Sequence, residues 1–186
     1  MIEIETGTEV MLARRQGRVA VLTFNRPEAR NALHPDTYAT LEHLLPALAE
    51  DDDVGAVMLT GAGGAFCAGG DVKGMNARNS AEAASPASWE SAVDDLRARQ
   101  RSVSAALHNF PKVTVAAIDG AAAGAGLSIA LACDLRVGSP RAIFTTAFAR
   151  VGFSGDFGGS WFLTQLVGGA KARELYLTAD RFDVDQ

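Results

Sequence analysis

Short runs of apolar residues alternate along the chain with stretches rich in glycine, proline and charged residues. The runs at residues 19–24, 54–60 and 113–118 are dominated by β-branched and other apolar side chains. Their length is typical of buried strands. Shorter apolar runs at residues 135–137 and 142–144 predict two further strands.

Between these runs, apolar residues recur three or four positions apart, which is the spacing of one helix face. Tyr38, Leu41 and Leu45 predict a helix over residues 35–52, with a bend at Pro46. Further helices are expected over residues 89–109, 127–133, 161–167 and 170–178, and a mobile loop over residues 74–88. Strands that alternate with helices predict an α/β fold.

Length and composition exclude several classes of protein. The 186 residues are 48% hydrophobic and 21% charged, which is enough apolar material for one core, so we expect a single domain over residues 1–186 rather than a disordered chain. No apolar run approaches the roughly 20 residues that a membrane helix needs. A net charge of −5 argues against non-specific binding of nucleic acid.

The two cysteines and the N-terminal residues indicate a cellular location. Cys67 and Cys133 are too few and too far apart for a disulfide scaffold, and Cys67 is expected to be a buried, inert thiol. The first ten residues carry three acids and no base, so we expect no secretory signal. These features predict a cytoplasmic protein.

Two of the predicted strands run directly into glycine-rich stretches, at residues 61–71 and 119–126. A glycine turn that enters a helix presents free backbone N–H groups and the positive end of the helix, so it can bind an anion or an oxyanion. A dinucleotide-binding loop would need GxGxxG, and both stretches lack the third glycine. No GxxxxGK[ST] motif occurs, which argues against nucleoside triphosphates.

Other catalytic patterns are also absent from the sequence. The best approach to the GxSxG pattern of serine hydrolases is GFSGD at residues 152–156, which ends in an acid. His34, His43 and His108 are expected to be ordinary surface or core histidines. No spacing of His, Cys or acidic residues suggests a metal site.

Four segments, taken in order, resemble the enoyl-CoA hydratase/isomerase (crotonase) family. They are NRPEARNAL at 25–33, FCAGGDVKGM at 66–75, DGAAAGAGLSIALACDLRV at 119–137 and LVGGAKARELYLTADRFD at 166–183. The resemblance covers about residues 10–186 and implies a spiral of repeated ββα units. Family members normally continue beyond the last segment into helices that cover the acyl site, so it also implies that this C-terminal helical section is missing. It further implies assembly as a homotrimer or a dimer of trimers.

The resemblance also implies where an acyl-CoA would bind. The backbone N–H groups of Gly70 and Ala125 would hold the thioester oxygen and stabilise an enolate. The adenine and phosphates of coenzyme A would lie against six positions in the first two motifs, namely Ala29, Arg30, Ala68, Asp71, Val72 and Lys73. Lys73 and Arg30 could also be plain surface cations. Coenzyme A would enter as part of the substrate, with no permanently bound cofactor and no metal.

The acid–base group departs from the hydratase pattern. The positions at which hydratases carry two glutamates are occupied here by Ser128 and Phe148. Asp156 matches the position of the catalytic aspartate in several isomerases of the family and in its dehalogenase branch, although it could instead be only the N-cap of the next helix. We therefore expect a double-bond isomerase with Asp156 as base. The alternatives are a hydratase, a dehalogenase or thioester hydrolase with Asp156 as nucleophile, and a non-catalytic acyl-CoA-binding relative.

Overall fold

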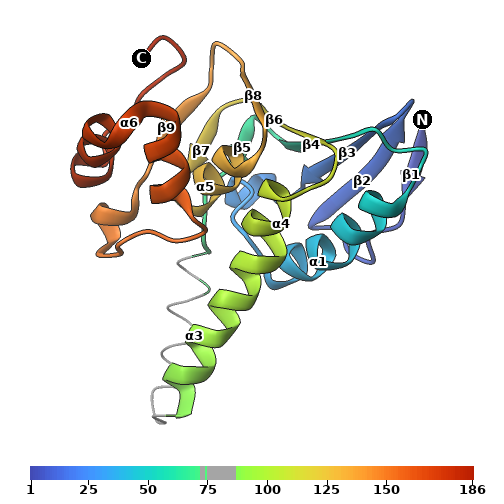
Figure 1. Cartoon of the computed structure of the whole chain (residues 1–186), viewed down its shortest axis with the longest axis horizontal. Coiled ribbons are helices and arrows are strands. Elements are labelled where there is room, and N and C mark those ends of the chain that lie inside the picture. The colour runs from blue at the N-terminus through green and yellow to red at the C-terminus, as the bar shows by residue number, and fades with distance from the viewer. Residues whose placement is uncertain (72–73, 75–86) are drawn as a thin grey trace.

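Six strands form one sheet in the order β1-β2-β3-β4-β6-β8 in the computed structural model, which describes residues 1–71, 74 and 87–186 (Figure 1). Their bounds are β1 Ile2–Ile4, β2 Met11–Gln16, β3 Val19–Phe24, β4 Ala56–Gly61, β6 Val113–Ile118 and β8 Leu135–Gly138. The pairs from β3 onward are parallel, whereas β1, β2 and β3 are antiparallel.

A second, smaller sheet is formed by three parallel strands in the order β5-β7-β9. These strands are β5 Ala65–Cys67, β7 Ala121–Ala123 and β9 Ile143–Thr145. Each of β4, β6 and β8 in the large sheet is followed along the chain by one strand of the small sheet and then by helical structure. This is a succession of ββα units, which confirms the predicted α/β fold.

Helices lie beside these sheets, and one long helix extends away from the rest of the chain (Figure 1). The α-helices are α1 Pro35–Glu50, α3 Ala87–Gln100, α4 Ala106–His108, α5 Ala125–Ala132 and α6 Gly159–Thr178. A π-helical turn, η2 Arg101–Ala105, joins α3 to α4, so that one continuous helical segment corresponds to the helix predicted over residues 89–109. Two short 3₁₀ helices, η1 Pro27–Ala29 and η3 Phe148–Val151, lie beside the glycine-rich turns.

The prediction was accurate for most strands and less so for the ends of helices. Helix α1 continues through Pro46. The two helices expected over residues 161–167 and 170–178 correspond to α6, which contains a non-helical residue, Gly168, with φ 78°. The loop expected over residues 74–88 lies largely outside the described residues, and its last two residues belong to α3.

Strands β5 and β7, which lie in the glycine-rich stretches, and the hairpin of β1 and β2 were not predicted from the sequence. In β2 only Met11 and Ala13 are buried, and they alternate with exposed Leu12 and Arg14. Such a short, half-polar strand has no continuous apolar run, and it is stabilised by its pairing with β3 rather than by its own composition.

The core lies between the sheets and the helices, and it fixes the glycine-rich turns in place. Phe24 and Phe66 meet edge to face at 5.5 Å between ring centroids, and both are almost fully buried. Cys67 is fully buried, and burial raises the pKa of its thiol to about 12, as expected for an inert cysteine. Among the described helices, none is long and apolar enough to cross a membrane.

Candidate active site

The small sheet determines where the site forms. Its three strands are parallel, so the segments that follow β5, β7 and β9 emerge at the same edge. Gly70 follows β5, Ala125 follows β7, and the chain after β9 leads through η3 to Asp156. Three residues that are far apart in the sequence are thereby brought to one place.

The two glycine-rich turns touch each other through their backbones. A Cβ at Gly69, where φ is +90°, would lie 2.8 Å from the Ala123 carbonyl oxygen and 3.2 Å from the Ala125 nitrogen. A Cβ at Gly126 would lie 2.8 Å from Cβ of Cys67 and would also overlap its carbonyl oxygen. Only glycine permits this approach at both points.

The backbone N–H groups of Gly70 and Ala125 are available at this junction. The Leu33 N–H donates to the Gly69 oxygen at 2.8 Å, which holds the strand that carries Gly70, while the Gly70 N–H donates no hydrogen bond to any described residue. Ala125 is the first residue of α5, so its N–H has no acceptor within the helix, and the N-cap, Gly124, provides no side chain. Both groups can therefore donate to a negatively charged oxygen.

Gly70, Ala125 and Asp156 line one cavity of about 150 Å³. The rest of its wall is backbone and apolar side chain, from Ala68, Gly69, Gly124, Ala147, Phe148, Val151 and Phe153. Asp156 is the only carboxylate among the described lining residues. The cavity thus combines two hydrogen-bond donors with one group that can accept or donate a proton.

Asp156 lies in a half-buried environment between η3 and α6. Burial raises the pKa of its carboxyl group to about 6. Its Oδ1 atom is buried and has no hydrogen-bond partner among the described residues. Such a carboxyl group can exist in both protonation states near neutral pH, which suits proton transfer.

The alternative role for Asp156, as the N-cap of the following helix, is wrong. The N-cap of α6 is Gly158, and no side chain caps this helix. The Gly159 N–H donates instead to the backbone oxygen of Asp156, at 3.1 Å. The Asp156 side chain is therefore not engaged in capping.

Neither of the two positions that the resemblance matches to hydratase glutamates offers a carboxylate. Phe148 is part of its wall and stacks on Tyr176, with 6.2 Å between ring centroids and 4° between planes. Ser128 is buried behind the cavity, where its Oγ donates to the Gly124 oxygen at 3.3 Å. A proton-transfer mechanism that uses two carboxylates finds only Asp156 among the described lining residues.

Of the six positions predicted to contact coenzyme A, four belong to the described residues. The Ala68 N–H donates to the Arg30 oxygen at 3.0 Å, so the first two motifs lie side by side. Ala29 belongs to η1 in the same turn. Arg30 is exposed. Asp71 forms an ion pair with Arg26 at 3.3 Å. Val72 and Lys73 lie outside the described residues.

Asn31 joins these motifs and was missed from the sequence. It is 1% exposed; its Nδ2 donates to the oxygens of Ala62 and Ala65, at 2.8 and 2.7 Å, and its Oδ1 accepts from the Arg26 N–H at 2.8 Å. These bonds hold the turn of residues 25–33 against the first glycine-rich stretch. An asparagine that follows a proline turn suggests a local bend, but nothing in the sequence indicates bonds to residues thirty positions away.

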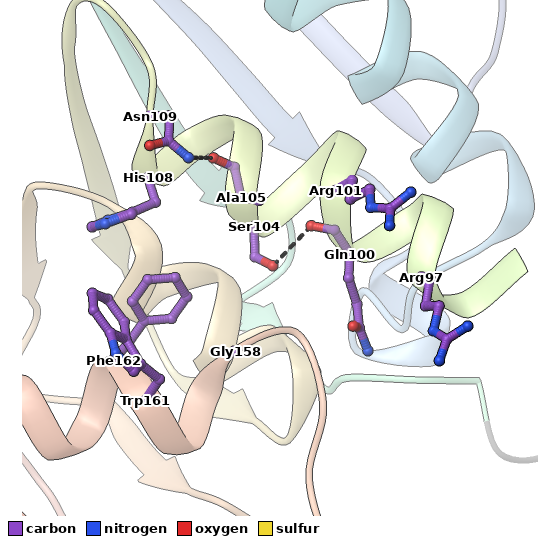
Figure 2. Close-up of a pocket in the computed structure, with 10 residues that line it drawn as sticks. All are labelled: Arg97, Gln100, Arg101, Ser104, Ala105, His108, Asn109, Gly158, Trp161 and Phe162. Atoms are coloured by element: carbon purple, nitrogen blue, oxygen red, sulfur yellow. Dashed lines mark hydrogen bonds between the residues drawn. The ribbon is translucent and has the colours of Figure 1, made fainter. Parts of the chain in front are cut away.

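A larger groove of about 460 Å³ lies between α3–α4 and the start of α6 (Figure 2). Figure 2 shows His108 facing Trp161 and Phe162, and each ring centroid lies 5.2 Å from that of His108. Gly158 is the residue next to the Asp156 turn that lines the groove, and none of the predicted site residues that the structure describes is in its wall. The smaller cavity is therefore the better candidate, because it contains the donors and the carboxylate. Among the described residues, no three His, Cys, Asp or Glu side chains gather as metal ligands would.

Comparison with known proteins finds similar sequences over nearly the whole chain. A family model described as enoyl-CoA hydratase/isomerase matches residues 14–186. The short-chain-enoyl-CoA hydratase of Clostridium acetobutylicum is 34% identical over 177 residues, which cover 95% of this chain and 64% of that protein. The 1,2-epoxyphenylacetyl-CoA isomerase of Escherichia coli is 34% identical over 179 residues, covering 96% of this chain and 66% of that protein.

Solved structures give the same result. The crystal structure of an enoyl-CoA hydratase from Polaromonas sp. JS666 has a TM-score of 0.85 and 35% sequence identity, and the match covers 94% of this chain and 65% of that one. The chain thus spans 64% and 66% of the length of the two curated relatives named above.

Proposed function

This chain belongs to the enoyl-CoA hydratase/isomerase family, and we propose that it acts on an acyl-CoA thioester by stabilising the enolate of its acyl group. The observation that carries the proposal is the cavity in which the N–H groups of Gly70 and Ala125 meet the half-buried carboxyl group of Asp156. Hydrogen-bond donors that are fixed before the reaction, at the place where negative charge develops, are commonly the largest single contribution to catalysis.

The proposed reaction is a shift of a carbon–carbon double bond. The Asp156 carboxylate takes a proton from Cα of a 3-enoyl thioester, and the electron pair moves onto the thioester oxygen to give a dienolate. The N–H groups of Gly70 and Ala125 stabilise this oxygen. The Asp156 carboxyl group then returns the proton to Cγ, the carbonyl re-forms, and the double bond lies between Cα and Cβ. One base completes the cycle, so no second carboxyl group is required.

Hydration is the second candidate, and it is favoured by the printed names of relatives such as the probable enoyl-CoA hydratase of Mycobacterium tuberculosis, 37% identical over 167 residues. Addition of water needs one group to orient and deprotonate the water and another to handle the proton at Cα. Ser128 and Phe148 occupy the positions where the hydratases have these groups, which supports the isomerase.

Coenzyme A is proposed to enter as part of the substrate and to bind along the two linked motifs. Arg30 offers an exposed cation; Ala68, whose N–H is bonded to the Arg30 oxygen, lines the cavity, and Ala29 precedes Arg30 in the same turn. Asp71 is held by Arg26, so we propose that this ion pair shapes the adenine and phosphate site. We place Val72 and Lys73 in the same site on the resemblance alone.

The proposal extends to assembly and location. We propose a homotrimer or a dimer of trimers, supported by exposed apolar side chains on β8 and α6 such as Val137, 61% exposed, and Leu177, 79% exposed. We propose a cytoplasmic location because both cysteines are free and buried, which suits a reducing compartment.

The decisive test is deuterium exchange at Cα and Cγ of an enoyl-CoA in heavy water, followed by NMR. Wild type is expected to exchange both positions, and Asp156→Asn is expected to lose about 10²- to 10⁴-fold in rate, because the amide cannot accept the proton. Asp52→Asn, which changes an exposed acid after α1, is the matched control and should exchange like wild type.

Two outcomes would contradict the isomerase. If Asp156→Asn exchanges as fast as wild type, Asp156 is not the base. If wild type removes the conjugated absorbance of crotonyl-CoA rapidly, hydration is the main reaction. A covalent ester trapped on Asp156 would indicate the dehalogenase or thioester hydrolase instead, and binding of the thioester without any exchange would indicate a non-catalytic relative.

A further inference from the structure

We infer that Tyr176 is a positioning residue for Asp156: its side chain supports the backbone on both sides of this residue and shields the carboxyl group from water. The inference rests on the proposed function, in which Asp156 carries the proton. Nothing in the motif pattern singles out Tyr176, which lies in the second half of α6.

The first observation is direct packing against the glycines that flank Asp156. A Cβ at Gly155 would lie 2.9 Å from Cε1 of Tyr176, and a Cβ at Gly159 would lie 2.6 Å from the Tyr176 hydroxyl oxygen. The tyrosine side chain therefore fills the space next to the backbone just before and just after the carboxylate. Movement of this side chain would release both ends of the segment that carries Asp156.

Tyr176 is itself held in place by the cavity wall and by β9. Its ring stacks on Phe148, which lines the cavity. The helical turn around it is fixed by two side-chain hydrogen bonds, from Thr146 Oγ1 to the Leu175 oxygen at 2.9 Å and from Thr145 Oγ1 to the Ala179 oxygen at 3.0 Å. The tyrosine is thus supported from both sides of its own position in α6.

Ser128 links the same tyrosine to the oxyanion turn. A Cβ at Gly159 would overlap Ser128 Oγ as well as approach the Tyr176 hydroxyl, so these two hydroxyl groups face the same point. Ser128 Oγ donates to the oxygen of Gly124, the residue before Ala125. Tyr176 and Ser128 therefore occupy the space between the proposed base and one proposed oxyanion donor.

The electrostatics agree with a shielding role. Burial, together with the negative charge of Asp156, raises the pKa of Tyr176 to about 12, although hydrogen bonding with Ser128 acts in the opposite direction. The phenol therefore stays protonated at neutral pH and adds no charge near the carboxylate. Burial raises the pKa of Asp156. The charge of Asp156 in turn contributes to the raised pKa of Tyr176, which shows that the two groups interact.

The test is a ¹³C NMR titration of the Asp156 carboxyl carbon, assigned with Asp156→Asn, combined with the rate of Cα exchange. Tyr176→Phe keeps the ring but removes the hydroxyl group beside Gly159, so it is expected to lose clearly less than Tyr176→Leu. Tyr176→Leu removes the ring and admits water, so the carboxyl pKa should fall by about one unit or more toward its ordinary value. Its kcat for exchange should fall at least about tenfold at pH 7 with little change in KM, because the base is weaker and less well aimed. Glu174→Ala, which removes an exposed side chain of the same helix whose ion pair is with Lys171, is the matched control.

The two measurements separate this inference from the proposed function. If the carboxyl pKa falls in Tyr176→Leu but wild type exchanges no substrate, the positioning role stands and the proposed function fails. If wild type exchanges substrate while Tyr176→Leu titrates and turns over like wild type, the inference is overturned. A loss in Tyr176→Phe equal to that in Tyr176→Leu would also overturn it, since the ring would then not be the important part. Tyr176→Met, which fills irregular space without a ring, replaces the leucine variant if that variant does not fold.

Discussion

Burial of a single carboxyl group, that of Asp156, has opposite effects on proton transfer and on folding. It brings the pKa to about 6, where the group can both take and return a proton. It also leaves Oδ1 without a hydrogen bond among the described residues, so the ionised form is poorly solvated in the folded chain. Residues that serve a reaction are often those that stabilise the fold least.

A pH-dependent stability difference between wild type and Asp156→Asn follows from this. The folded pKa lies above the unfolded value of 3.8, so the folded state binds the proton more tightly, and the contribution of Asp156 to stability is lost as pH rises from about 4 to 6. Above pH 6 the variant should be more stable than wild type by about 1–2 kcal/mol, allowing for the exposed part of the side chain. Below pH 4 the two should converge. Urea unfolding at pH 3.5 and pH 8 measures this, and an equal difference at both pH values would contradict it.

At the scale of elements, the important feature is the contact between the turn after β5 and the turn before α5. Helix α5 begins where Gly69 allows the first turn to approach it. The contact is between backbones, so a small change in either turn displaces a proposed donor. The geometry of the cavity therefore depends on Gly69 and Gly126. These glycines permit the close approach of the segments that follow β5 and β7, which are paired in the small sheet.

Adding one methyl group at this contact tests it. In Gly69→Ala the new Cβ would press against the Ala123 oxygen at 2.8 Å, so the exchange rate should fall about 10²-fold or more as Ala125 moves. Gly64→Ala is the matched control, because its φ is similarly positive at +79° but nothing lies within 4 Å of its Cβ. The control should lose only about 1–2 kcal/mol of stability and keep its rate. If Gly69→Ala and Gly64→Ala lost the same amount of exchange rate, backbone strain alone would explain the loss.

The elements also show which parts of the fold were predictable. Strands β3 and β6 were predicted at their observed bounds, because both lie inside the large sheet and are continuous runs of mostly apolar residues. Strand β2 alternates polar and apolar residues over only six positions and was missed. The interruption of α6 at Gly168 falls in the gap between the two helices predicted over residues 161–167 and 170–178, and its positive φ is one that glycine adopts readily.

The site was predictable only as far as motifs reach. Gly70, Ala125 and Asp156 were named because their surroundings resemble a family, and the structure places them in one cavity. Asn31 and Tyr176 were not named, because their roles depend on contacts with residues distant in the sequence. Helical periodicity shows which face of α6 is apolar, but not which residue on it meets a turn that precedes the helix.

For the whole molecule, the open edge of the large sheet is the notable feature. Strand β8 ends the sheet of the described residues and pairs only with β6. Leu135 and Val137 on this strand are 55% and 61% exposed. An apolar edge strand of this kind favours contact with another chain.

Self-association through this edge is expected and can be measured by sedimentation velocity. Val137→Lys should shift the distribution toward the monomer, because a charged side chain would be buried at the contact. Its thermal midpoint should change little at low protein concentration, where the exposed side chain makes few contacts within its own chain. A wild-type chain that stays monomeric at high concentration would contradict the proposed assembly.

The order of the ββα units has a consequence for how the site arises during synthesis of the chain. Gly70, Ala125 and Asp156 each come from a different unit: Gly70 follows β5, Ala125 begins the helix after β7, and Asp156 lies between η3 and α6. A ribosome releases these units one after another, so the two N–H donors can meet before the carboxylate has left the exit tunnel. The growing chain would thus hold the proposed oxyanion donors without a base for a time, and the proposed base would arrive last, together with the helix that bears Tyr176.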